Sequence, residues 1–563
     1  RESDISDVDA SYNWWGTTDA SLIATKIYDW YDDNGRSFIQ YSPILGQSSE
    51  TLPQGPANPF MTNLSKVSSS PPTFKLSLSA DTTPVEMRIS DDPTILVGWE
   101  AYSAVKDFQT SGNQYLYEQF KDVSDNQSAI AFIRPPSALG GVVSTDTTWD
   151  LAGSPYMVEN SVLVDSGVKL TIDPGVEVKF NIDTGLQIKG ELVARGTQVD
   201  PIVFTSSQDS PAAGDWASIE FLPQSTDVVF DGNGDYASGS IIEQAQVAYG
   251  AGSGKQGVIL IDGTAVFINR TTLEHNASSG IRLSNQSGEL NKVSNSEIKN
   301  NSGYGIYVDA YQRTSVVTID GCVIDNNSSG GISTGGGDAG GSHVFTFTGN
   351  AVSNNGGDGI QGHANGTQTI SDNVVSANSG NGIRTRGNGI YTISGNIISG
   401  NTGRGVQAIY TTHHIVDNTI SSNGGGIEIS QGGTYTITGN SIIGNIAIEG
   451  SAFLSQSAWS SSVVLEGNII KDNVVTGGSL GGVYGGTSVR STVFVFNPQS
   501  GDPTFTFKGN DIYNNTSDYE LYNSRESDIS DVDASYNWWG TTDASLIATK
   551  IYDWYDDNGR SFI

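Results

Sequence analysis

Two groups of polar residues in this sequence have types and spacings that suit ligand binding. In the first, Asp231, Asn233 and Asp235 are separated by single residues, and alternating oxygen ligands of this kind are typical of a Ca²⁺-binding loop. Position twelve of that loop pattern is Ile242 instead of Glu, so an ordinary Asx-rich turn is the alternative interpretation. Ca²⁺ is the one cofactor that the sequence suggests.

The second group follows Gly-apolar pairs that recur along the chain, such as Gly382-Ile383. Residues just after these pairs are expected to point outward from successive strands and to form a strip. Its aromatic and basic members suit the binding of an acidic sugar, and an ordinary solvated sheet face is the alternative. The proposed glycan-binding residues are Tyr307, His363, Arg384 and Arg386.

The same strip lacks the pair of acidic groups that glycosidase chemistry requires. Acid-base cleavage of a glycosidic bond needs two carboxylates about 5 to 9.5 Å apart. The two outward columns contain no such pair on neighbouring coils, Asp309 stands isolated, and His363 is only a fragment of a hydrolase pattern. The sequence therefore predicts no catalytic residue and a protein that is not an enzyme.

The elements that position these residues are indicated by two columns of asparagine. Spacings of 22 or 23 residues are the commonest in each column, and the two columns run five residues apart. Stacked coils about 4.8 Å apart would let each amide donate to one neighbouring copy and accept from the other. The first column includes Asn350, Asn373, Asn396, Asn418 and Asn440, and the second includes Asn355, Asn378, Asn401, Asn423 and Asn445.

In the Gly-apolar pairs, from Gly280-Ile281 to Gly426-Ile427, we expect glycine to permit a left-handed turn and the apolar residue to enter the core. Between residues 61 and 133 the pattern is different. Val85, Met87 and Ile89 alternate with polar residues, which predicts a half-buried antiparallel strand.

Composition agrees with an all-β chain and limits its partners. Of 563 residues 68 are Gly and 16% are charged, which suits short strands joined by tight turns. The net charge of -33 disfavours nucleic acid and anionic lipid. One cysteine, Cys322, permits no disulfide within the chain, and no apolar run approaches the roughly 18 residues of a membrane span.

An internal duplication indicates a larger array. Residues 1–39 and 525–563 are the same string, so the repeating unit is 525 − 1 = 524 residues long. Tandem arrays form quasi-one-dimensional structures in which each unit contacts mainly its neighbours. Neighbouring units of the same chain or fibre, and cell-surface glycans, are the expected partners.

Segments such as TISGNIISGNTGRGV (392–406) and TISDNVVSANSGNGI (369–383) resemble the right-handed parallel β-helix repeat of the pectate-lyase-like superfamily. NWWGTTD, at 13–19 and 537–543, is similar to a closing coil of surface members, and the alternating segment after residue 61 is similar to an immunoglobulin-like or fibronectin-like sandwich. The resemblance implies an all-β fold and, because hydrolases and lyases share it, leaves function open.

Five segments follow from these patterns. They are a closing coil and cap of a preceding repeat at 1–46, a linker at 47–60, an immunoglobulin-like β-sandwich at 61–134, a β-helix at 135–540 and the start of a second cap at 541–563. The predicted function is a structural unit of an extracellular, cell-surface fibre, sheath or adhesin. A polysaccharide-binding or polysaccharide-degrading β-helix is the alternative.

Overall fold

The computed structural model describes residues 8–9, 39–40, 60–69, 72–80, 84–91, 98–109, 116–128, 130–133, 137–284, 288–309, 314–335, 342–448, 450–456, 461–477, 490–495, 504–523 and 532–552. The chain divides into two compact units, 1–137 and 138–563. The predicted closing coil at 1–46 and linker at 47–60 lie outside the described residues, apart from two short strands, β1 (Val8–Asp9) and β2 (Ile39–Gln40), and the first residue of β3.

The first unit contains two antiparallel sheets with a shared core. One sheet has the order β3 (Phe60–Ser69), β4 (Pro72–Ser79), β7 (Val105–Gln109), and the other has the order β6 (Glu100–Ala101), β5 (Glu86–Ser90), β8 (Leu116–Lys121), β9 (Ala131–Ile133). The predicted strand through Met87 and Ile89 is confirmed, and both side chains pack against Leu76 and Leu78 of the facing sheet. The more specific immunoglobulin-like assignment stays a prediction.

Glu118 on β8 is buried in this unit, although a carboxylate is costly to remove from water. Neither of its oxygens has a hydrogen-bond partner among the described residues, and burial raises the pKa of this carboxyl well above its ordinary value. The side chain is therefore held in its neutral form.

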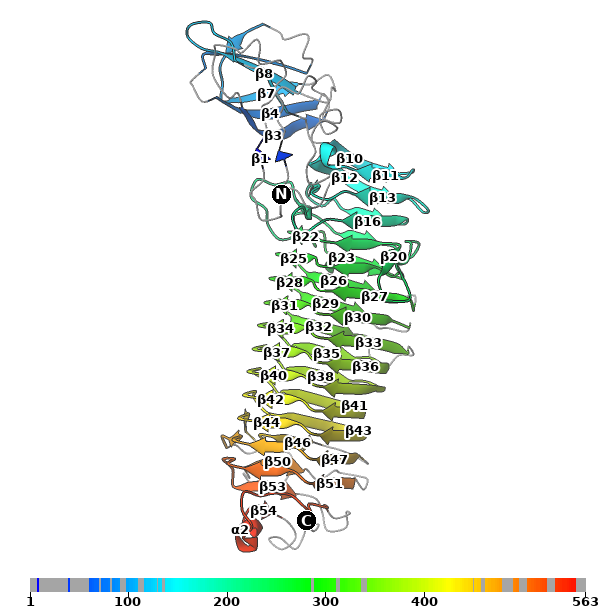
Figure 1. Cartoon of the computed structure of the whole chain (residues 1–563), viewed down its shortest axis with the longest axis vertical. Coiled ribbons are helices and arrows are strands. Elements are labelled where there is room, and N and C mark those ends of the chain that lie inside the picture. The colour runs from blue at the N-terminus through cyan, green and yellow to red at the C-terminus, as the bar shows by residue number, and fades with distance from the viewer. Residues whose placement is uncertain are drawn as a thin grey trace. The chain divides into compact units, whose positions relative to one another are not determined.

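The second unit is a parallel β-helix whose strands stack in three sheets (Figure 1). Sheet 1 includes β23 (Gly257–Asp262), β26 (Ser279–Ser284), β29 (Tyr304–Asp309), β32 (Gly330–Gly335), β35 (Ile360–His363) and β38 (Ile383–Arg386). Sheet 2 includes β27 (Leu290–Ser294), β30 (Val316–Asp320), β33 (His343–Thr348), β36 (Gly366–Ser371) and β39 (Gly389–Ser394). Sheet 3 includes β28 (Glu297–Lys299), β31 (Val323–Asp325), β34 (Ala351–Ser353), β37 (Val374–Ser376), β40 (Ile397–Ser399) and β42 (Thr419–Ser421).

Two longer strands, β41 (Val406–Val416) and β43 (Ile427–Thr438), run through the corner from sheet 1 into sheet 2. Inward side chains of all three sheets form one continuous apolar core, in which isoleucine and valine occupy equivalent places on successive coils. The predicted right-handed parallel β-helix is confirmed. Among the described residues no helix is long and apolar enough to cross a membrane.

Both asparagine columns form hydrogen-bonded ladders, as the spacing predicted. The backbone N–H and the Nδ2 of Asn373 both donate to Oδ1 of Asn396, at 2.9 and 3.0 Å, and Nδ2 also donates to the carbonyl of Phe347. Asn378 and Asn401 repeat this pattern in the second column. These amides are almost completely buried, so each depends on its neighbours for the hydrogen bonds that water would supply.

The first ladder extends into the closing motif, because Nδ2 of Asn510 donates to Oδ1 of Asn537 at 2.9 Å. At its other end Cys322 occupies an asparagine position, and burial raises the pKa of its thiol to about 12. The second ladder ends at Asn515, whose Nδ2 donates to Oε2 of Glu520. The C-terminal ends of the two ladders are thus completed by the side chains of Asn537 and Glu520.

The predicted role of the recurrent glycines is wrong. None of the seven from Gly280 to Gly426 has a positive φ. A Cβ on Gly382 would instead lie 2.4 Å from Cγ2 of Ile398 and 3.0 Å from Nδ2 of Asn401, so the position is small because a core side chain and a ladder amide approach the backbone. The left-handed residue is the one before each ladder asparagine, for example Asp372 at φ +58° and Ala377 at φ +55°.

The core also contains an aromatic stack that crosses three coils. His413 lies between the rings of Tyr391 and Tyr435, at centroid distances of 4.8 and 5.3 Å and nearly parallel. Its Nε2 is 2.9 Å from Oγ1 of Thr385. Burial lowers the pKa of His413 to about 3, so the imidazole is neutral in the folded protein at ordinary pH.

We expect Asn401→Ala to destabilise the β-helix by about 3 kcal/mol, because it removes the acceptor of the buried Asn378 backbone N–H and one of the two acceptors of its Nδ2. Chemical denaturation would measure this difference. The matched control is Asn388→Ala, which changes an exposed asparagine in a nearby turn and should have little effect. Equal stabilities of the two variants would contradict the structural role of the ladder.

The pKa of His413 predicts a pH dependence of stability. The unfolded chain takes up a proton near pH 6.5 and the folded chain only near pH 3, so stability falls as pH drops through that window. Between pH 6.5 and 4.5 the free energy of unfolding should decrease by about 2 kcal/mol more in the wild type than in His413→Phe. If the free energy of unfolding fell by the same amount between the two pH values in both proteins, the low pKa of His413 in the folded protein would be refuted.

Candidate functional site: the outer face of sheet 1

The outward residues of sheet 1 stand in register on successive coils. Gln361 pairs with Arg384, Arg384 with Gln407, and Gln407 with Glu428. The predicted neighbouring column is also in register, with His363 beside Arg386. Because side chains alternate along each strand, both columns point away from the core formed by residues such as Ile383.

A third outward column lies on the other side of the Gly-apolar pairs and was not considered from the sequence. It contains Asp358, Asn381 and Arg404, each directly before a recurrent glycine. Oδ1 of Asp358 accepts hydrogen bonds from the backbone N–H and Nδ2 of Asn381, at 2.7 and 3.1 Å. Oδ1 of Asn381 in turn accepts from the backbone N–H of Arg404 at 2.8 Å.

Charged contacts join the third column to the column that contains Arg384, Gln407 and Glu428. Nε of Arg404 lies 3.3 Å from Oε2 of Glu428, and its Nη1 donates to the carbonyl of Gly450. Nε2 of Gln407 donates to Oε1 of the same Glu428 at 3.0 Å. Together with Arg384 these side chains form one connected surface, called here the polar face: Asp358, Asn381, Arg384, Arg404, Gln407 and Glu428.

Arg384 is the cation of the polar face that is most available to a ligand. Its Nη1 lies 3.9 Å from Oδ2 of Asp358, which is long for an ion pair, and its side chain is 36% exposed. Its Nε is buried and has no hydrogen-bond partner among the described residues, so a ligand would meet the terminal nitrogens of the guanidinium. Arg386 lies two positions further along the same strand, is exposed, and has its guanidinium 5.9 Å from the ring centroid of Tyr410.

The structure groups three of the four predicted strip residues. His363, Arg384 and Arg386 lie on the adjacent strands β35 and β38. Tyr307 lies in the column of Arg384 but three strands away, with Ser333 and Gln361 between them. It therefore belongs to a separate part of the sheet 1 surface.

Asp309 is not isolated, as the sequence had suggested. Its Oδ2 lies 3.0 Å from Nη2 of Arg282, and that guanidinium also lies over the ring of Tyr307 at 4.7 Å. Burial raises the pKa of Tyr307. The Arg282 guanidinium is therefore already engaged by Asp309 and Tyr307, whereas Arg384 makes only a long contact with Asp358.

The polar face contains two carboxylates, but they do not lie on neighbouring coils, because β38 and β41 separate the coil of Asp358 from the strand of Glu428. The predicted absence of a carboxylate pair on neighbouring coils therefore stays a prediction. Asp358 and Glu428 both belong to the polar face, each with a side chain only 13% exposed. Arg384 contacts the first and Arg404 the second. The sequence search missed this arrangement because Asp358 lies before its glycine, whereas both inspected columns lie after it.

Asp231 begins the tight connection between β19 (Val229–Phe230) and β20 (Tyr236–Ser238). Its Oδ1 accepts from the backbone N–H groups of Asn233 and Asp235, at 2.8 and 3.0 Å, and these bonds lower the pKa of its carboxyl. This geometry is that of an Asx turn, the alternative interpretation. No cluster of three His, Cys, Asp or Glu side chains suited to a metal ion occurs in the described part of the chain, and Ca²⁺ binding stays a prediction.

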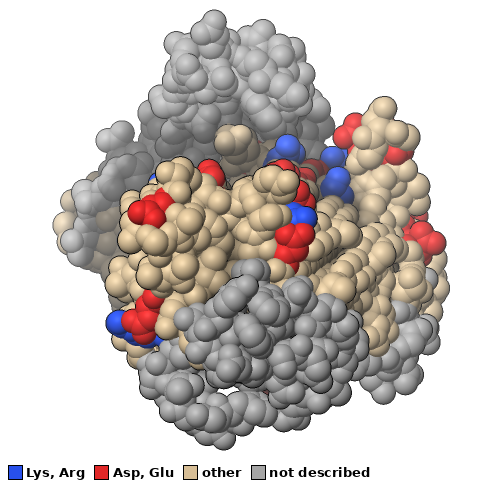
Figure 2. Space-filling model, turned by 90° about the horizontal axis from the view of Figure 1, so that it is seen from below, with Lys and Arg blue, Asp and Glu red and all other residues tan. Residues whose placement is uncertain are grey.

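Charged side chains of both signs also occur close together at the C-terminal end of the molecule, in small groups separated by uncharged surface (Figure 2). A ligand on this protein therefore meets local pairs of charges, despite the net charge of -33. On the polar face, the partly exposed guanidinium of Arg384 next to amides suits a carboxylate and hydroxyl groups held on one chain.

Comparison with known families gives a match over most of the chain. The family described as a right handed beta helix region matches residues 156–340 and 339–530. Among curated proteins, the protein bark beetle of Drosophila melanogaster is 37% identical over 71 residues, which are 13% of this chain and 2% of that protein. The chain therefore matches only a small part of that relative.

Two solved structures share the fold. Both are A-modules of mannuronan C-5 epimerases from Azotobacter vinelandii, each 14% identical to this chain. One has a TM-score of 0.31 and covers 59% of this chain and 87% of its own, and the other has a TM-score of 0.28 with 59% and 88% covered. The prediction that the protein is not an enzyme is contradicted here, because its structural neighbours are enzymes, although the likeness shows the fold alone.

Proposed function

The chain belongs to the right-handed β-helix family, and we propose that it is a carbohydrate-active member which binds an acidic polysaccharide along sheet 1. The observation that carries this proposal is the polar face, in which the partly exposed Arg384 is only weakly paired with Asp358. A guanidinium forms paired hydrogen bonds with a carboxylate, so uronate sugars suit Arg384 and Arg386. The amides of Asn381 and Gln407 supply partners for hydroxyl groups.

The regular spacing of the face supports a polymer as ligand. Neighbouring strands lie about 4.8 Å apart, so two successive strand spacings span about 10 Å, which is the order of two sugar units in an extended chain. Side chains on β35, β38, β41 and β43 then meet successive parts of one glycan. Chemistry on that glycan would draw on Asp358 and Glu428, the carboxylates beside the two arginines.

An extracellular, cell-surface location fits this ligand and is part of the proposal. Acidic polysaccharides are exposed on cell surfaces, and an acidic protein with local basic groups can bind them without binding other polyanions broadly. The expected partner is a surface glycan, with neighbouring repeat units as a second partner.

A structural role in a tandem fibre is a second candidate, favoured by one observation. Residues 1–39 recur without change as 525–563, and units repeated in tandem along one chain would form an elongated array. This role is compatible with glycan binding, because a rod can present the polar face at regular intervals.

Arg384→Ala is expected to weaken binding of polymannuronate or polygalacturonate about tenfold, because it removes the most accessible cation of the polar face. Affinity electrophoresis and calorimetry on the whole chain would measure this. Arg270→Ala is the matched control, since Arg270 is an exposed arginine that lies next to Glu243, off the polar face. Unchanged binding in Arg384→Ala, or equal losses in both variants, would contradict the proposal.

Activity is tested on the same substrates. Epimerisation or cleavage of the bound uronate polymer, followed by NMR of the products, should be lost in Asp358→Asn or Glu428→Gln if these carboxylates take part. Loss of activity with retained binding would assign them to chemistry, whereas unchanged activity in both variants would exclude them from it.

The fibre candidate predicts that electron micrographs of the native assembly show filaments with a repeat of one 524-residue unit. Compact particles without that repeat would count against a fibre and leave the glycan proposal unaffected.

A further inference from the structure

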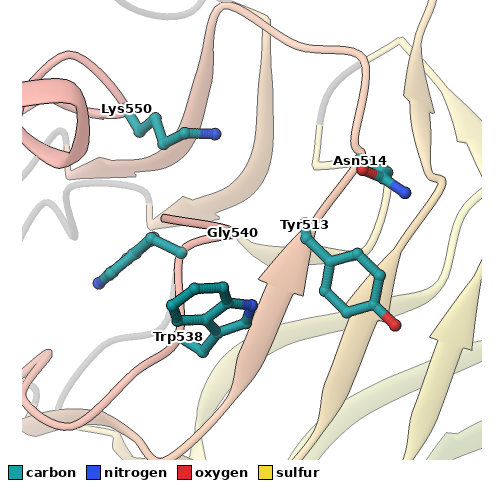
Figure 3. A pocket seen from close by; sticks show the side chains of 6 residues that line it. Tyr513, Asn514, Trp538, Gly540 and Lys550 are labelled. Carbon is teal, nitrogen blue, oxygen red and sulfur yellow. The ribbon is translucent and has the colours of Figure 1, made fainter. Parts of the chain in front are cut away.

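The last coils of the β-helix border an open hollow of about 340 Å³, far along the chain from the polar face (Figure 3). We propose that this hollow is a second glycan site, which binds one acidic sugar residue. The inference extends the proposed glycan function to a place that none of its residues occupies. The hollow is lined by Tyr513, Asn514, Trp538, Trp539, Gly540 and Lys550.

The asparagine ladder determines how the two tryptophans of the closing motif point. Asn537 accepts from Asn510 and so fixes the next residue, Trp538, in a bridge with Asp511 of β52 (Asp511–Tyr513). Because successive side chains of an extended segment point to opposite sides, Trp538 points outward and Trp539 points inward. Trp539 is buried in the core, and its ring lies 6.0 Å from that of Phe507.

Trp538 is 43% exposed, although its indole has a large apolar surface. Tyr513, the last residue of β52, also lines the hollow. At Gly540 the backbone has a φ of +77°, and a Cβ there would lie 3.3 Å from Cβ of Tyr513, so glycine keeps the space open. An exposed aromatic side chain that is held in place beside an opening is typical of a binding site.

The polar groups around these rings select the class of ligand. The faces of Trp538 and Tyr513 can pack against the C–H groups of a sugar ring, while the Asn514 side chain offers an amide. Nζ of Lys550 lies 3.5 Å from Oε1 of Glu520 and belongs to the lining, so its ammonium can also reach a ligand carboxylate.

A second ammonium argues against a cationic ligand. Nζ of Lys471 lies 5.8 Å from the ring centroid of Tyr513, on the strand before it. Aromatic rings alone would also suit a quaternary ammonium group, but two lysines nearby repel it. The combination therefore favours a sugar that carries a carboxylate.

The test is calorimetric titration of the whole chain with trimannuronate, trigalacturonate, neutral cellotriose and choline as separate probes. Trp538→Ala should lower the affinity for at least one acidic trisaccharide about tenfold, and Trp538→Phe should lower it less because it keeps an aromatic face. Lys550→Met should weaken binding of that acidic trisaccharide and leave cellotriose unchanged. Tyr536→Ala is the matched control, since Tyr536 is a highly exposed aromatic residue outside the lining.

Thermal unfolding would test whether Trp538→Ala is still folded. If Trp538→Ala does not fold, the affinities of Trp538→Phe and wild type are compared in its place. The inference is wrong if Trp538→Ala and Tyr536→Ala have equal affinities for every probe, or if choline binds in place of the acidic sugars. If Arg384→Ala loses polymer binding while Trp538→Ala does not weaken any probe, the second site fails and the proposed function stands. The reverse result supports the second site and refutes the first.

Discussion

Each coil of this β-helix obtains hydrogen bonds for its buried amides from the next coil, and the rest of the structure depends on that constraint. At two corners of each coil a single asparagine side chain makes these bonds. Its Oδ1 accepts from the backbone N–H and from the Nδ2 of the equivalent asparagine on the preceding coil. A buried amide without such partners would be strongly unfavourable. The positions of neighbouring coils are therefore set residue by residue.

This arrangement separates the interior from the exterior. Inside, isoleucine, valine and the Tyr391–His413–Tyr435 stack must occupy equivalent places in successive coils, because the core is continuous and close-packed. Outside, a side chain can change without altering the stack. The exterior columns of sheet 1 are accordingly varied, and arginine, glutamine and glutamate succeed one another on a single surface.

The same rigidity gives both proposed glycan sites their geometry. Parallel strands hold Arg384 and Arg386 on one side of β38, and the end of the first ladder holds Trp538 with its ring outward. Side chains held by a stiff scaffold lose little conformational entropy when a ligand binds. A fold shared by proteins with different activities can thus acquire a site through a few outward substitutions.

The sequence by itself determined the fold class, the coil period and both asparagine ladders, because a stacked amide requires the same residue type at the same place in every coil. It also placed His363 beside Arg386, since strand alternation follows directly from spacing. The tertiary structure decided that the recurrent glycines are small because Ile398 and Asn401 approach them, and that Asp358 and Glu428 share one face. It also placed Asn537 in the ladder, and hence Trp538 beside Lys550. These contacts join residues whose separation follows no repeat, so their proximity depends on how the corners turn and how the last coil closes.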